Sequence, residues 1–196
     1  MKLGAAVAGD LRRAVTILAA ALIILWAVLA ANYLFFGGHL LRFGILPRSV
    51  SGLRGIAFAP FLHAGVAHLA GNSVGIVLLG GLILLRDEAD FWIVTIAGGL
   101  IGGFATWLLA RPLIHVGASG VIFAYFGYLL CTGLFERRLG AIALSLFALV
   151  AWGGLAFGVL PGQPGVSWES HLFGLIGGAA AAWLIARYRR RLAAAR

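Results

Sequence analysis

Long apolar runs, each bounded by charged residues, glycine or proline, divide this chain into six segments. Each run is close to the ~20 residues that a helix needs to cross ~30 Å of hydrocarbon at 1.5 Å per residue. The pattern therefore predicts six membrane-spanning helices, at residues 14–36, 68–85, 91–109, 119–135, 140–160 and 171–187. We expect an all-α membrane protein in which a six-helix domain, 14–187, lies between tails at 1–13 and 188–196.

The fourth run is short for a helix that must cross the whole bilayer. Its first residue, Ser119, is therefore expected below the membrane surface, and the irregular segment 110–118 must dip inward to meet it. Irregular backbone at that depth is tolerated only inside protein or beside water. The pattern thus predicts a water-filled cavity around Ser119.

The connection at 37–67 is too long for a simple turn. Its arginines alternate with large apolar side chains, among them Phe43, Leu53 and Phe58. This alternation is typical of an amphipathic segment that lies in the plane of the membrane interface. We expect it to form the first external loop of the bundle.

Composition supports lipid as the solvent for most of the chain. Of 196 residues, 62% are hydrophobic and only 11% are charged, and the mean hydropathy is +1.04. The net charge of +9 does not indicate nucleic-acid binding, because the basic residues lie in tails and short loops, where they orient spans and meet anionic head groups. The single cysteine, Cys131, allows no internal disulfide.

The distribution of basic residues predicts the topology. With the N-terminus in the cytoplasm, that side holds most of the fifteen lysines and arginines, and the external side holds only Arg42, Arg48, Arg54 and Arg111. This bias favours both termini inside. The first run is longer than a signal-peptide core and is expected to stay uncleaved. We expect a multi-pass protein of a bacterial inner membrane, with Ser119 and His171 near the external ends of their helices.

Ser119 is the strongest candidate nucleophile in the sequence. It follows Gly117, precedes Gly120 and begins an apolar helix. The glycines leave the hydroxyl uncrowded and allow a tight turn, and the unpaired N–H groups of a helix N-terminus can bind an oxyanion. Glycine and serine also pack helices in membranes, so this motif depends on the polar residues elsewhere.

Three other polar residues fall at the starts of predicted helices. His171 can act as the base for a serine, which is a weak nucleophile alone. Gly174 and Gly178 follow it at a spacing that lets a neighbouring helix come close. His68 and Asn72 lie four residues apart on one helix face and can donate to a developing oxyanion. Glu169 is the one acidic residue expected on the external side, but it lies two residues before His171, and side chains at that spacing point apart on a helix. A Ser/His dyad is therefore favoured over a triad that includes Glu169.

Together these motifs resemble the rhomboid family of intramembrane serine proteases. The match consists of His63-x4-His68-x3-Asn72, Gly117-Ala-Ser-Gly120 and His171-x2-Gly174, and covers about residues 53–186. The resemblance implies a rhomboid-type bundle and cleavage of membrane-spanning protein substrates without metal or cofactor. It also implies Ser119 and His171 as the dyad, an oxyanion site at His68, Asn72 and the Ser119 amide, and support of that site by His63.

Two positions depart from the family pattern. Members often carry a tyrosine four residues after the serine, stacked on the histidine, where this chain has Phe123. The ring remains available for stacking, so activity is still expected. A Trp-Arg pair is common in the first loop, where Leu53-Arg54 stands here, one residue out of register with His63.

Three other classes of function would use some of the same residues. A metal site built from His63, His68, His115 and His171 lacks nearby thiolates or carboxylates, so no metal is expected. A catalytically silent rhomboid-like protein could bind membrane clients, although such relatives typically lack the serine or the histidine. A small transporter could use buried His and Asn, but no inverted repeat is visible. The substrate and the oligomeric state are not indicated by the sequence.

Overall fold

The computed structural model describes residues 2–195, so Arg196, counted above among the cytoplasmic charges, lies outside it. Six of its helical segments are long and apolar enough to cross a membrane, as predicted. They are α1 (Lys2–Leu34), α4–η3–α5, α6 (Glu88–Leu109), α7 (Ser119–Glu136), α8–η4 and α9 (Trp168–Ala194). The second span joins α4 (Val66–Gly75), the π-helix η3 (Ile76–Gly80) and α5 (Gly81–Arg86), and the fifth joins α8 (Leu139–Trp152) and the 3-10 helix η4 (Gly153–Val159).

The helices extend beyond several predicted boundaries. The first candidate span runs over Val7–Leu34 and the last over Trp168–Ala194. Residues 2–13 and 188–194, expected as tails, continue α1 and α9 as helix. Hydropathy marks where lipid contact ends, but charged residues do not by themselves stop a helix.

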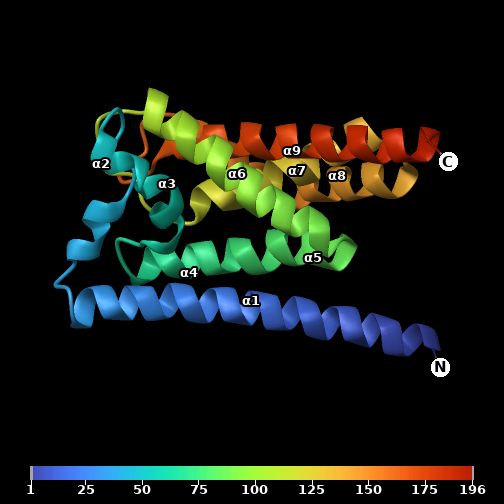
Figure 1. The fold of residues 1–196 in the computed structure, drawn as a ribbon, viewed down its shortest axis with the longest axis horizontal. Coiled ribbons are helices and arrows are strands. Elements are labelled where there is room, and N and C mark those ends of the chain that lie inside the picture. Colours follow the sequence, from blue (N-terminus) through green and yellow to red (C-terminus); the bar gives the residue numbers. More distant parts are fainter. Residues whose placement is uncertain (1, 196) are drawn as a thin grey trace.

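Helix α7 forms the centre of the bundle. It packs most extensively against α9 and also contacts α6 and α8, and much of its length is buried. In Figure 1, α1 runs along one edge beside α4 and α5, α9 runs along the other edge with α7 and α8 beside it, and α6 crosses obliquely towards α5. Both termini lie at one end of the bundle, and the start of α7 lies towards the end that carries α2 and α3 (Figure 1).

Charged residues join four helices at the end that carries the termini. Arg189 of α9 contacts Asp90 at 2.8 Å and Asp87 at 2.7 Å, and Asp90 also accepts a hydrogen bond from Tyr128. Glu136 of α7 pairs with Arg86 of α5. Asp90 is only 1% exposed, so these pairs neutralise charge that would be costly to bury alone.

The connection between α1 and α4 contains short helices: η1 (His39–Phe43), α2 (Val50–Leu53), α3 (Gly55–Phe58) and η2 (Ala59–Phe61). A β-carbon on Gly55 would overlap the backbone of Gly44 and Ile45, so this close crossing requires glycine. Ile45 forms an isolated antiparallel bridge with His115. This bridge fastens the connection to the irregular segment that leads into Ser119.

Candidate active site

Ser119 and His171 line the same cavity, although their helices are far apart in sequence. The contact between α7 and α9 explains this, because a β-carbon on Gly174 would overlap the carbonyl of Gly120, and one on Gly178 would overlap that of Ala124. The expectation that these two glycines admit a neighbouring helix is thus confirmed. Gly120 is adjacent to Ser119, and His171 lies one turn before Gly174.

The cavity has a volume of about 410 Å³. Besides the serine and the histidine it is lined by His68 and Asn72 from α4, by residues 113–116, and by the 163–167 connection. The predicted cavity around Ser119 is therefore present. Among residues 2–195 no hydrogen bond joins the Ser119 hydroxyl to the His171 ring. Catalytic hydrogen bonds are often loose without substrate and tighten when substrate binds.

Gly117 brings the segment that precedes Ser119, residues 110–118 (the serine loop), against α4. Its φ of +117° lies in the region that favours glycine, and its N–H donates to the Ala59 carbonyl at 2.9 Å. A β-carbon there would lie 2.7 Å from Nε2 of His68 and 3.4 Å from Nδ2 of Asn72. Both side chains therefore reach the backbone just before Ser119.

Asn72 presents an unused donor at this place. The residue is buried, and within residues 2–195 its Nδ2 has no hydrogen-bond partner. An unpaired buried donor costs ~1–3 kcal/mol. A developing oxyanion beside Ser119 is the type of acceptor that would satisfy it.

His63 holds the serine loop through a hydrogen bond to its backbone. It is 2% exposed, and its Nε2 accepts the backbone N–H of Ala118 at 3.3 Å. Its ring meets that of His68 edge-on, with centroids 5.1 Å apart. Burial, together with the neighbouring His68, lowers the pKa of His63 to about 4. At neutral pH the ring is therefore uncharged and can accept this hydrogen bond.

Two contacts hold the His171 ring. Phe123 stacks on it with centroids 4.1 Å apart and an interplanar angle of 8°, so the ring contact survives the loss of the tyrosine hydroxyl. Nδ1 of His171 lies 2.9 Å from the carbonyl oxygen of Gly158 in η4. A carbonyl only accepts, so Nδ1 carries the proton and Nε2 is left with a free lone pair.

Glu169 is engaged elsewhere. Its carboxylate pairs with Arg111, which also donates to the Val166 carbonyl at 3.3 Å. His115 lies beside this pair, with Nε2 donating to the Arg111 carbonyl at 3.0 Å and Nδ1 bonded to the Ser167 hydroxyl. Burial lowers the pKa of His115, which favours its neutral form. These bonds tie the 163–167 connection to segment 110–118.

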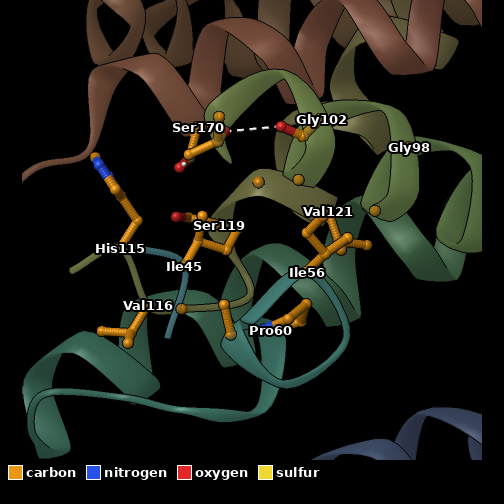
Figure 2. A pocket seen from close by; sticks show the side chains of 16 residues that line it. Ile45, Ile56, Pro60, Gly98, Gly102, His115, Val116, Ser119, Val121 and Ser170 are labelled. Carbon is orange, nitrogen blue, oxygen red and sulfur yellow. Dashed lines mark hydrogen bonds between the residues drawn. The ribbon is translucent and has the colours of Figure 1, made fainter. Parts of the chain in front are cut away.

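A second, smaller hollow of about 30 Å³ lies beside Ser119. Figure 2 shows Ser119, His115 and Ser170 on one side of it and the apolar side chains of Ile56, Pro60 and Val121 on the other. Its volume is enough for one water molecule, which needs ~10–15 Å³ on this measure.

Sequence reasoning did not single out Gly158 or the pairing of Arg111 with Glu169. Gly158 acts through its carbonyl, and it stands in a stretch where several glycines look alike. The ion pair joins residues 58 positions apart. The only available signal was that Glu169 is the one acidic residue predicted on the external side.

Comparison with known proteins agrees with this geometry. The family model described as the rhomboid domain matches residues 50–188. The chain is 36% identical to the putative rhomboid protease YdcA of Bacillus subtilis, over 66% of each protein. It is 39% identical to the uncharacterised protein Rv1337 of Mycobacterium tuberculosis, covering 76% of this chain and 65% of that protein. A weaker match, 31% identical, is to the Bacillus subtilis rhomboid protease GluP, over 60% of this chain and 23% of GluP.

The chain thus spans slightly less than two thirds of the mycobacterial relatives. The family model covers most of this chain, including every motif named above, and the six apolar helices form an all-α bundle. The chain therefore belongs to the rhomboid family.

Proposed function

We propose that this protein is a serine endopeptidase that cleaves membrane-spanning protein substrates with a Ser119/His171 dyad. The observation that carries the proposal is the His171 ring, stacked on Phe123, bonded to Gly158 and facing the cavity that Ser119 lines. A ring used only for packing would not need a fixed tautomer with a free Nε2. The family's rhomboid proteases support the same chemistry.

In the acylation step, Nε2 of His171 accepts the Ser119 proton while the oxygen attacks the scissile carbonyl carbon. The carbonyl electron pair becomes an oxyanion, bound by the Ser119 N–H, Nδ2 of Asn72 and His68. Collapse of this intermediate breaks the C–N bond, and the imidazolium returns its proton to the leaving amine. An acyl-enzyme on Ser119 remains.

Hydrolysis of the acyl-enzyme requires a water molecule that can move from beside Ser119 into reach of Nε2 of His171. The hollow beside the serine supports this step, because Ser170 and Thr106 place hydroxyl groups along its wall. His171 takes one water proton as the hydroxide oxygen attacks, and the proton then passes to the departing Ser119 oxygen. The carboxylate product and the free serine result.

A helical substrate needs a route from the lipid, and α8 offers one. Ala141 and Ala148 are its only buried residues, so α8 is loosely held at the edge of the bundle. We propose that substrates enter beside α8, with the protease in a bacterial inner membrane and both termini in the cytoplasm.

The test is cleavage of a purified single-span substrate in vesicles, with products sized by mass spectrometry. Ser119→Ala should abolish cleavage, whereas Ser51→Ala, at an exposed position in α2, should leave it unchanged. Equal cleavage by Ser119→Ala would refute the proposal. A fluorophosphonate that labels the wild-type chain but not Ser119→Ala would also exclude a silent, client-binding relative.

A further inference from the structure

The connection between α1 and α4 carries two arginines that share one aromatic ring. The guanidinium carbon of Arg42 lies 5.3 Å from the ring centre of Phe43, and that of Arg54 lies 4.4 Å from it. Both arginines are exposed. Cation–π contacts attract each group to the ring, and a nearby anion would reduce the repulsion between the two like charges that share it.

No protein anion meets either charge within residues 2–195. Glu169, the acidic residue expected at this end of the bundle, is paired with Arg111. The remaining cation of the connection, Arg48, donates to the carbonyls of Leu108 and Ala110 at the end of α6. Neither Arg42 nor Arg54 therefore has a carboxylate partner among these residues.

The fold of the backbone places the two arginines near the same ring. The close crossing of Gly55 over Gly44 sets Arg54 beside Phe43, because each glycine adjoins one of these residues. The Phe43 ring is also fixed by an edge-on contact with Phe58, at 6.4 Å and 75°. A preorganised pair of guanidinium groups suits phosphate, which guanidinium binds through paired N–H donors.

Apolar side chains around the pair indicate the source of the phosphate. Val50 is 85% exposed and Phe58 51%, and Leu53 and Phe61 are also exposed. Such a surface is unfavourable in water and is typical of a segment seated in a lipid interface. A soluble phosphate would leave these side chains uncovered, whereas acyl chains would cover them.

We propose that Arg42, Phe43 and Arg54 form a binding site for the phosphate of an anionic phospholipid in the leaflet at this end of the bundle. Both guanidinium groups donate to the lipid phosphate, and its acyl chains lie along Leu53 and Phe58. The connection also bridges to His115 through Ile45, so a bound lipid sets the depth of the serine loop in the membrane. Lipid binding at this site does not depend on proteolytic activity.

The test uses the full chain in vesicles of phosphatidylcholine with one tenth phosphatidylglycerol, plus a trace of photoactivatable phosphatidylglycerol or photoactivatable phosphatidylcholine. Labelled residues are mapped by mass spectrometry. An arginine at the membrane surface contributes about fivefold in affinity for an anionic lipid. The phosphatidylglycerol probe should therefore label segment 40–58 at least tenfold more than the phosphatidylcholine probe. Labelling of the basic segment 187–195 is the internal control.

In the double variant Arg42→Gln/Arg54→Gln, labelling of segment 40–58 by the phosphatidylglycerol probe should fall to the level given by the phosphatidylcholine probe. Labelling of segment 187–195 should not change. Equal labelling of wild-type segment 40–58 by the two probes would overturn the proposal without any variant. Unchanged labelling of the folded double variant would also overturn it. Loss of labelling on adding millimolar inorganic phosphate would identify a free-anion site instead of a lipid site.

Discussion

Gly158→Ala tests the orientation of the His171 ring without changing any proposed reacting group. The added β-carbon would lie 2.7 Å from Cζ of Phe123 and 3.3 Å from Nδ1 of His171. An ordinary carbon–carbon contact is ~3.5–4 Å, so the ring or the η4 backbone must move by about 1 Å. Either movement disturbs the Phe123 stack and the bond between Nδ1 and the Gly158 carbonyl.

A displacement of about 1 Å at a reacting group costs roughly 100-fold in rate. At 1.36 kcal/mol per factor of ten, this corresponds to a loss of about 2.7 kcal/mol of transition-state stabilisation. We expect the loss in kcat for cleavage of a single-span substrate, with KM little changed, because Gly158 does not line the cavity. The rate of fluorophosphonate labelling should fall in parallel, since it needs the base but not substrate entry.

Gly154→Ala is the matched control. It makes the same change in the same 3-10 helix, and an added β-carbon there meets nothing within 4 Å. Its kcat should equal that of the wild type. The reasoning is refuted if Gly158→Ala, folded and with the same melting temperature as Gly154→Ala, also keeps wild-type kcat.

A double-mutant cycle locates the cause of the loss. Phe123→Leu removes the ring carbon that the new β-carbon would strike. Gly158→Ala should therefore cost less in the Phe123→Leu background than in the wild type, with a coupling energy of about 1 kcal/mol or more. Additive losses would show that Gly158→Ala acts by another route.

Three further changes test other parts of the account. Asn72→Ala should reduce kcat by about 10²–10³ with little change in KM, measured by cleavage kinetics, because it removes a proposed oxyanion donor. The pKa of His63 falls from 6.5 to about 4 on folding, so the unfolded chain protonates first and this residue alone should lower the free energy of unfolding by about 3 kcal/mol as pH falls from 6.5 to 4. Chemical denaturation at a series of pH values should show a steeper slope for the wild type than for His63→Gln, which keeps the part that comes from His115, whose pKa burial also lowers. Arg189→Ala leaves the buried Asp90 carboxylate without its arginine and should destabilise the fold by about 3 kcal/mol, whereas Arg13→Ala, from an exposed pair, should cost less than about 1 kcal/mol in the same denaturation assay.

In the proposed mechanism, the Gly158 carbonyl would connect the orientation of the His171 ring with substrate entry. The carbonyl belongs to η4, which continues the loosely held α8. If a substrate displaces this segment, the acceptor for Nδ1 moves with it. His171 would then be fully oriented only once the segment has closed again around the substrate.

Much of the fold could be predicted because the bilayer imposes one length and one polarity on every span. The six apolar runs mark the six helices, and Gly174 and Gly178 mark the face where α9 meets α7. The residue at which α1 begins and the residue at which α9 ends were harder to predict. Arg12, Arg13 and the arginines after Tyr188 suit a helix as well as they suit a tail, and hydropathy does not distinguish the two.

Side chains with distinctive chemistry were also accessible from the sequence. Ser119, His171, His68 and Asn72 are rare polar residues at helix starts, and the structure gathers all four around one cavity. What the sequence could not reveal are contacts made by backbone or by distant pairs. The Gly158 carbonyl has no side chain to identify it, and Arg111 meets Glu169 only because segment 110–118 folds against the start of α9.

Activation of Ser119 by His171 within one cavity is the step on which the proposed function depends. It is tested most directly by the rate at which a fluorophosphonate modifies the full chain at neutral pH, with the modified residue located by mass spectrometry. We expect modification at Ser119 alone, slowed by at least about 100-fold in a folded His171→Gln variant. Modification of a different serine, or an equal rate at Ser119 without the imidazole, would contradict it.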